Sequence, residues 1–92
     1  MKSIFNNSDI LITGGTGSFG TAFVEYILKN YNPSRLIIFS RDEFKQFNMS
    51  QKIDKKYKNK VRFFIGDVRD KERLRRAMNN VKVVVHAAAM KH

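Results

Sequence analysis

Three glycines near the N-terminus have the spacing of a loop that binds phosphate groups. Gly14, Gly17 and Gly20 follow the apolar run at residues 10–13 in the pattern G-x-x-G-x-x-G. The first glycine allows a tight turn, the second lets the backbone approach a pyrophosphate, and the third lets a helix pack closely on a strand. Each role needs a residue without a Cβ atom. The spacing therefore predicts a phosphate site for a nucleotide cofactor, between a strand and the start of a helix.

The end of the second apolar run carries groups suited to a phosphorylated ribose. A carboxylate at this place binds the ribose 2′-hydroxyl of NAD, whereas a hydroxyl or an arginine suits the 2′-phosphate of NADP. Here the run ends in Ser40-Arg41, and Lys45 follows about one helical turn later. We predict NADP, because a guanidinium makes paired, charge-assisted hydrogen bonds to a phosphate. Two alternatives stay open: Asp42 either accepts from a ribose hydroxyl or caps the next helix, and Arg41 could be an ordinary exposed arginine.

Residues after the third and fourth apolar runs are expected beside the same ligand. Asp67 could accept a hydrogen bond from the adenine amine with Val68 against the ring, or could be a turn residue. The small residues Ala87-Ala88-Ala89 either leave room for the cofactor or begin a helix. Lys91 could meet a phosphate or sugar oxygen, or lie on the surface. His86, within an apolar run, is expected to be a hydrogen-bonded histidine, either in the core or behind the residues that contact the ligand, rather than a catalytic base.

Short apolar runs alternate with longer amphipathic ones, which is typical of a parallel sheet with crossover helices. We expect strands at residues 10–13, 35–40, 61–65 and 81–86, and helices at residues 18–30, 42–57 and 71–78. Right-handed crossovers give the strand order 3-2-1-4. The predicted fold class is α/β, a Rossmann-type doubly wound parallel sheet with its ligand crevice at the carboxyl ends of the first and fourth strands.

Several packing expectations follow from the same pattern. Residues 36–39 are apolar at every position, as in a strand covered on both faces. The second helix is expected to direct Phe44, Phe47 and Ile53 toward the core, and the third helix Leu74, Ala77 and Met78. Because the chain stops directly after its fourth strand, we expect residues 1–92 to be the N-terminal part of one NADP-binding domain, with no second domain.

Composition excludes several classes of protein. No cysteine is present, which excludes disulfides, thiolate metal sites and a catalytic thiol, and the two histidines lack companions at metal-ligand spacing. No apolar run reaches the ~18 residues that span a bilayer, so we expect a soluble, cytoplasmic protein. The net charge of +10 raises the alternative of a polyanion-binding module. We interpret the lysines and arginines as solvated helix faces, because the aromatic residues are too sparse to stack on bases.

Four segments resemble extended short-chain dehydrogenases/reductases, and more specifically the nucleotide-sugar 4,6-dehydratases. They are TGGTGSFG at 13–20, FSRDE at 39–43, FFIGDVRD at 63–70 and HAAAMKH at 86–92. The strongest similarity is to the inverting UDP-N-acetylglucosamine 4,6-dehydratases of polysaccharide biosynthesis, and it covers nearly the whole chain. Another enzyme of the same superfamily, an epimerase or a reductase, is the alternative.

The resemblance implies an activity and assigns binding roles. In such an enzyme NADP+ takes hydride from sugar C4, water is lost across C5 and C6, and hydride returns to C6. The residues implied to hold the cofactor are Gly14, Thr16, Gly17, Ser18, Phe19, Gly20, Ser40, Arg41, Asp42, Lys45, Asp67, Val68, Ala87, Ala88 and Lys91. Lys91 is also implied to meet the UDP-sugar substrate. The family's tyrosine–lysine pair has no counterpart here, so we assign no catalytic residue, expect this chain alone to be inactive, and expect the longer protein to be a homo-oligomer.

Overall fold

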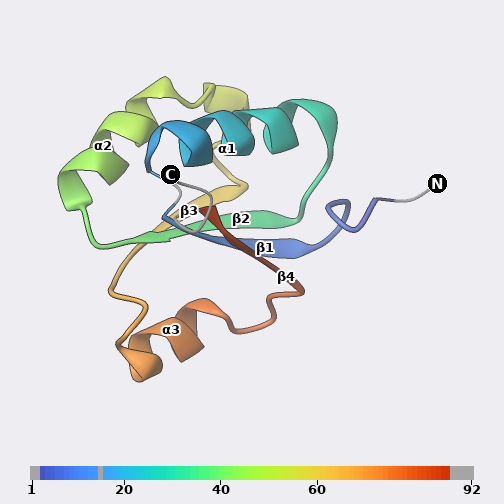
Figure 1. Ribbon diagram of the computed structural model, residues 1–92. Helices are drawn as coiled ribbons and strands as arrows, with labels where there is room; N and C mark the ends of the chain where they lie inside the picture. The colour runs from blue at the N-terminus through green and yellow to red at the C-terminus, as the bar shows by residue number, and fades with distance from the viewer. Residues whose placement is uncertain (1–2, 15, 88–92) are drawn as a thin grey trace.

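A computed structural model describes residues 3–14 and 16–87, which form a four-stranded sheet with helices on both faces. The elements along the chain are β1 (Asp9–Thr13), α1 (Ser18–Asn30), β2 (Arg35–Ser40), α2 (Glu43–Lys52), the short 3-10 helix η1 (Lys55–Tyr57), β3 (Val61–Ile65), α3 (Lys71–Ala77) and β4 (Val83–His86). All strand pairs are parallel and their order is β3-β2-β1-β4, as predicted. Helices α1 and α2 cover one face of the sheet, and α3 covers the other (Figure 1).

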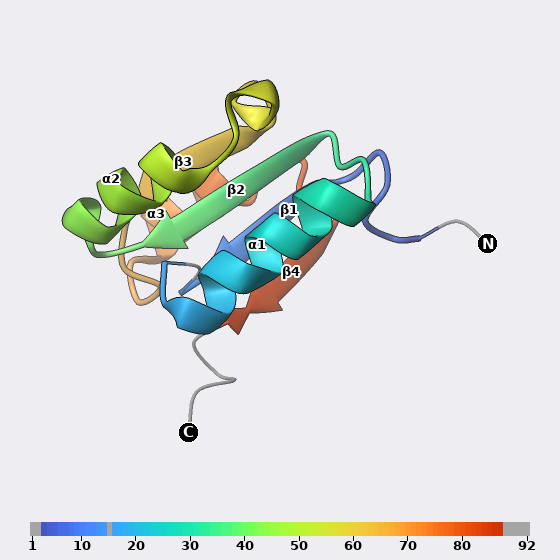
Figure 2. The ribbon, with the colours of Figure 1, turned by 90° about the horizontal axis from the view of Figure 1, so that it is seen from above.

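The strand register aligns the carboxyl ends of all four strands at one edge of the sheet. Thr13 at the end of β1 pairs with Phe39 of β2 on one side and with His86 of β4 on the other. Ser40, the last residue of β2, pairs with Ile65 at the end of β3. The turns that lead into α1, α2 and α3 therefore start from a common edge. Viewed from above, α1 runs over β1 and β4 while α2 lies toward β2 and β3 (Figure 2).

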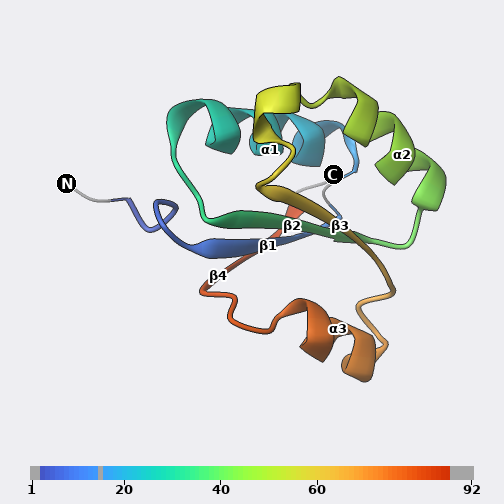
Figure 3. The same cartoon turned by 180° about the vertical axis from the view of Figure 1, so that it is seen from behind.

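Apolar side chains fill both faces of the two central strands. On the side of α1 and α2, Ile12 and Ile38 pack with Ile27 in the larger core cluster. On the opposite side, where Figure 3 shows α3, Phe39 packs with Ala77 in a smaller cluster. The residues of β2 from 36 to 39 are no more than 6% exposed, so the prediction of a strand covered on both faces is confirmed.

Helix α2 differs from the prediction in its length and in its buried face. It ends at Lys52 instead of continuing to Tyr57, and η1 follows as a separate turn. Ile53 is buried as expected, but Phe44 and Phe47 are 72% and 61% exposed, so their prediction as core residues was wrong. The buried positions of the helix are Gln46 and Met49, three residues apart on one side, and these leave both phenylalanines toward solvent.

The segment between α3 and β4 also begins and ends differently from the prediction. Helix α3 stops at Ala77, and Met78 is 39% exposed instead of packing in the core. Asn80 has a φ of 66°, in the left-handed region that asparagine tolerates, and the Val81 N–H donates to the Met78 carbonyl at 3.0 Å. This turn uses the first residues of the expected strand, so β4 begins at Val83 rather than at Val81.

Candidate functional site

A hollow of about 550 Å³ lies at the carboxyl edge of the sheet, where the crevice was predicted. Its lining comes from the ends of β1, β2 and β4 and from the turns that follow β1, β2 and β3. The lining residues are Thr13, Gly14, Phe39, Ser40, Arg41, Gly66, Asp67, Val68, Arg69 and His86. The structure thus brings together five predicted site residues that are far apart in sequence: Gly14, Ser40, Arg41, Asp67 and Val68.

The glycine turn begins at a residue whose backbone conformation favours glycine. Gly14 has a φ of 68°, and its N–H donates to the Phe39 carbonyl at 3.1 Å, which ties the turn to the end of β2. Gly17 precedes α1, and no side chain among the described residues caps that helix. Helices α2 and α3, by contrast, are capped by Asp42 and Asp70. Because the first N–H groups of a helix need acceptors, the start of α1 suits an anion.

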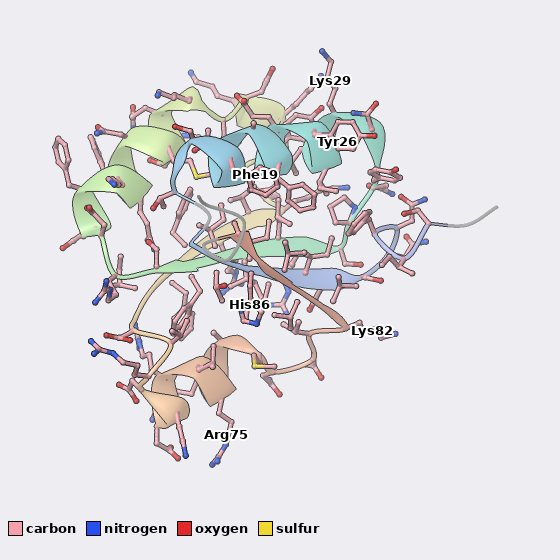
Figure 4. All side chains as sticks on the ribbon, in the orientation of Figure 1. Phe19, Tyr26, Lys29, Arg75, Lys82 and His86 are labelled. Carbon is pink, nitrogen blue, oxygen red and sulfur yellow. The ribbon has the colours of Figure 1, made fainter. Side chains whose placement is uncertain are left out.

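The residues that follow the glycine turn differ in their burial and in the hollow that they face. Phe19 is 42% exposed and stacks on Phe23, with ring centroids 5.9 Å apart, so its side chain follows the helix (Figure 4). Gly20 is buried, and its role in close packing of helix and strand stays a prediction. A second hollow, of about 230 Å³, lies between the turn and α2. Its lining residues include Thr16, Gly17, Ser18 and Lys45, so Lys45 faces the glycine turn rather than the first hollow.

At the end of β2, Asp42 and Ser40 have different surroundings. The Asp42 carboxylate accepts a hydrogen bond from the Lys45 N–H at 3.0 Å, so the prediction that Asp42 caps a helix is confirmed. Ser40 is 9% exposed, and its Oγ accepts a hydrogen bond from Nε2 of Gln46 at 2.9 Å. Gln46 was not among the predicted site residues. Its only signal is a polar residue one turn before Met49 on the buried side of α2.

Asp67 is held by two arginines at the rim of the first hollow. It accepts hydrogen bonds from the Arg69 N–H at 2.8 Å and from Nη2 of Arg69 at 2.7 Å, and Nη1 of Arg41 lies 3.6 Å away. Hydrogen bonds from the side chain and backbone of Arg69 hold the pKa of Asp67 well below its usual range. Arg41 is exposed, as one interpretation of the sequence expected, yet it also lines the hollow. Arg69 was missed, although Asp67-x-Arg69 is a spacing at which an aspartate can accept from a backbone N–H two residues on.

The turn that carries Asp67 is fixed by close packing at Gly66. A Cβ atom on Gly66 would lie 2.7 Å from both Cζ of Phe39 and Cγ of Arg73. Arg73 in turn donates from Nε to the Ile65 carbonyl at 2.7 Å, and its guanidinium lies 4.2 Å from the centre of the Phe64 ring. The sequence predicted that a glycine here eases the bend after the third strand. The structure adds that only a hydrogen fits between the sheet and α3.

At the end of β4, the structure corrects one expectation. His86 is exposed rather than in the core, because α3 leaves the outer part of β4 uncovered; it lies on the α3 side of the sheet (Figure 4). Its ring is nevertheless hydrogen-bonded, with Nδ1 2.7 Å from Oγ1 of Thr13. Ala87 is 1% exposed and packs in the larger core cluster, so its side chain does not line the hollow. Ala88 and Lys91 lie outside the described residues.

Taken together, the groups around the glycine turn and the strand ends suit an anionic nucleotide. They comprise a turn with a left-handed glycine, an uncapped helix start, a serine hydroxyl and two guanidinium groups, all of them suited to phosphate oxygens. Within the described part of the chain, no group of three or more metal-ligating side chains gathers. None of the helices described there has the length and apolar character needed to cross a membrane.

Comparisons of the sequence agree with this arrangement. A family model described as polysaccharide biosynthesis protein matches residues 10–92. A UDP-N-acetylglucosamine 4,6-dehydratase (inverting) of Campylobacter jejuni is 58% identical over 89 residues, which are 97% of this chain and 26% of the relative. A UDP-glucose 4-epimerase of Rickettsia bellii is 44% identical over 91 residues, 96% of this chain and 26% of that protein. The chain therefore spans about a quarter of the length of these curated relatives.

Comparisons of the structure show the same fold in solved proteins. Pen from Bacillus thuringiensis matches with a TM-score of 0.85 and 38% identity, over 98% of this chain and 28% of that one. A dTDP-glucose 4,6-dehydratase from Bacillus anthracis, solved in complex with NAD, matches with a TM-score of 0.68 and 27% identity, over 86% of this chain and 26% of that one. The predicted Rossmann-type fold is thus confirmed by strand order and by these neighbours.

Proposed function

Because the chain belongs to the polysaccharide biosynthesis protein family, we propose that it is the NADP-binding portion of a nucleotide-sugar 4,6-dehydratase that acts on UDP-N-acetylglucosamine. One observation carries the proposal. Gly14, the first glycine of the turn after β1, meets the Ser40-Arg41 pair of β2 and Asp67 after β3 at one hollow at the carboxyl edge of the sheet. Open α/β sheets bind dinucleotides at this edge.

The proposed contacts follow from the donors around the hollow. The N–H groups at the start of α1, next to Gly17, bind the diphosphate, and Gly14 supplies the turn that brings them there. Ser40 and Arg41 bind the 2′-phosphate at the end of β2. Val68, which is 50% exposed, offers an apolar surface to the adenine ring beside Asp67. These contacts are binding roles, and none of them transfers a proton.

The choice of NADP rests on the residues at the end of β2. The relative from Bacillus anthracis was solved with NAD, a cofactor for which a carboxylate at this place binds the ribose hydroxyls. Here the nearest carboxylate in sequence, Asp42, is engaged in capping α2 through the Lys45 N–H. Ser40 and Arg41 remain at the hollow, and a hydroxyl and a guanidinium both donate to a phosphate.

When bound, NADP+ would supply a hydride acceptor and donor for the sugar. The residues of this chain would orient it, and we propose that the groups that move protons belong to the longer protein. A sugar-nucleotide epimerase is the second candidate, supported by the Rickettsia relatives that are 42–44% identical. Mass spectrometry of UDP-N-acetylglucosamine incubated with the longer protein separates the two, because a dehydratase removes one water and an epimerase leaves the mass unchanged. A cytoplasmic location and self-association stay predictions.

Calorimetric titration of the chain with NADP+, NAD+ and a short oligonucleotide, at two salt concentrations, tests the binding proposal. We expect NADP+ to bind most tightly, and Arg41→Ala to weaken NADP+ binding by about tenfold, the effect of one charge-assisted hydrogen bond. Arg75→Ala is the matched control, because Arg75 is an exposed arginine on α3 that pairs with Glu72 away from the hollow (Figure 4). Preferential, strongly salt-dependent oligonucleotide binding would instead favour the polyanion-binding module.

A further inference from the structure

We propose that Gln46 is a positioning residue, which fixes the hydroxyl of Ser40 as a hydrogen-bond donor to the 2′-phosphate and thereby contributes to the preference for NADP+ over NAD+. The inference rests on the proposed function, and it concerns a residue of α2 that has no place in the glycine turn or among the charged groups of the hollow.

Gln46 is a buried polar side chain with a well-defined set of partners. It is 4% exposed, on the side of α2 that faces the sheet. Its Nε2 lies 2.9 Å from Oγ of Ser40, 3.1 Å from the carbonyl oxygen of Phe64 and 3.4 Å from the carbonyl oxygen of Ser40. The amide of Gln46 therefore connects the ends of β2 and β3 by hydrogen bonds from the side of the sheet that α2 covers.

These partners fix which end of the amide faces the sheet. A carbonyl oxygen can only accept, so the presence of two carbonyls requires the NH2 group of Gln46 to point at them. The NH2 group has two hydrogens, and the two shorter distances lead to Oγ of Ser40 and to the Phe64 carbonyl. The Ser40 hydroxyl is thus an acceptor toward Gln46.

This arrangement determines what the hydroxyl can offer to a ligand. A serine hydroxyl has one hydrogen, and a hydroxyl that accepts from Gln46 keeps that hydrogen for another partner. None of the hydrogen bonds among the described residues has Oγ of Ser40 as its donor. Ser40 lines the hollow next to Arg41, so the hydrogen is available there. An ionised phosphate only accepts hydrogen bonds, whereas a ribose hydroxyl does not need a donor at this place.

The inference is tested by the affinities of the chain for NADP+ and NAD+ in native protein and in three variants, measured by calorimetry. In Gln46→Met the side chain keeps its length but loses its donors. We expect NADP+ binding to weaken by about fivefold, which is the effect of losing one neutral hydrogen bond. NAD+ binding should change by less than about twofold. Ser40→Ala is expected to lower the same preference. In the double variant, Gln46→Met should have no further effect on the preference, because its partner is gone.

Gln51→Met is the matched control, since Gln51 is an exposed glutamine on α2 whose Nε2 lies 3.5 Å from Oγ of Ser50, away from the hollow. It should leave both affinities unchanged. A merely structural role for Gln46 would weaken both cofactors equally or only lower stability, and either result overturns the inference.

A measurement on native protein avoids dependence on the folding of the variants. In the NMR spectrum, we expect the side-chain NH2 signals of Gln46 to shift more on addition of NADP+ than of NAD+, with the signals of Gln51 unmoved. Equal shifts with the two cofactors would overturn the inference. If native protein binds neither dinucleotide, the proposed function fails and the inference falls with it. If native protein prefers NADP+ while Gln46→Met keeps that preference unchanged, the inference alone fails.

Discussion

Replacing Gly66 by alanine tests whether close packing fixes the turn that carries Asp67. The added methyl carbon would lie 2.7 Å from Cζ and 2.9 Å from Cε2 of Phe39, and 2.7 Å from Cγ of Arg73. Phe39 is 0% exposed, and its ring is stacked on that of Phe64, so moving it disturbs this packing. Arg73 is held by its hydrogen bond to the Ile65 carbonyl. Both neighbours must therefore move if alanine is to fit.

The cost of Gly66→Ala can be sized from these contacts. Overpacking a well-filled site costs about 1–3 kcal/mol. Alanine also makes the unfolded chain less flexible than glycine does, which stabilises the fold by about 0.4–1 kcal/mol where the backbone conformation suits alanine. We therefore expect a net loss of about 1–2 kcal/mol in the free energy of unfolding. In a domain of this size that loss lowers Tm by roughly 5–15 °C.

Urea denaturation followed by circular dichroism measures this change, and a second substitution identifies its source. Phe39→Leu removes the two ring atoms that the new methyl group would meet. In a Phe39→Leu background, Gly66→Ala should therefore cost less than it does in native protein, because contacting residues are coupled. Part of the cost should remain, because the contact with Cγ of Arg73 is unchanged. If Gly66→Ala costs the same in both backgrounds, the clash with Phe39 is not the cause. A native-like stability of the single variant would refute the packing argument outright.

Three further predictions concern stability. Asp42→Ala should cost about 1 kcal/mol in the free energy of unfolding, since it removes the cap on the Lys45 N–H, as urea denaturation would measure. Asp67→Asn should lower the free energy of unfolding at neutral pH, and the difference in stability between the variant and native protein should narrow below about pH 4. The pKa of Asp67 is lower in the folded than in the unfolded chain, so its ionised carboxylate stabilises the fold above that pH and loses this effect on acidification. A difference that stays constant with pH, in thermal denaturation, would contradict this. Met49→Ala should lower the free energy of unfolding by about 2–5 kcal/mol, because Met49 is 3% exposed. Phe47→Ser should change it by less than about 0.5 kcal/mol, because Phe47 is exposed. Equal losses would instead place both residues in the core.

Most of the sheet could be predicted because its signals are local. Residues 36–39 are apolar without interruption, which marks a strand buried on both faces, and the structure has β2 at Arg35–Ser40. The glycine spacing after β1 placed the start of α1 correctly at Ser18. Strand order then followed from the handedness of the crossovers rather than from any single residue. The convergence of Ser40, Arg41 and Asp67 at one edge is a consequence of that order.

The errors concern properties that depend on neighbours distant in sequence. Phe44 and Phe47 are hydrophobic, yet α2 directs Gln46 and Met49 toward the sheet, because polar and apolar groups there find partners on β2 and β3. His86 lies in an apolar run, but its exposure depends on how far α3 extends over β4. Gln46 was missed for the same reason. A buried glutamine is a signal only when the carbonyl of Phe64 and the hydroxyl of Ser40 are known to lie beside it.

The charges at the hollow bear on the two interpretations of the basic composition, solvated helix faces and a polyanion-binding surface. A polyanion-binding surface needs many cations spread over a face, each gaining from the release of counterions. At the hollow, one carboxylate, Asp67, lies within 4 Å of two guanidiniums, those of Arg41 and Arg69. Two positive charges against one leave a small local excess of positive charge, which suits a single phosphate group but not the many charges of a continuous phosphate backbone. This arrangement favours a compact anion over a polymer. The weak salt dependence expected of such binding is the property that the titrations at two salt concentrations would measure.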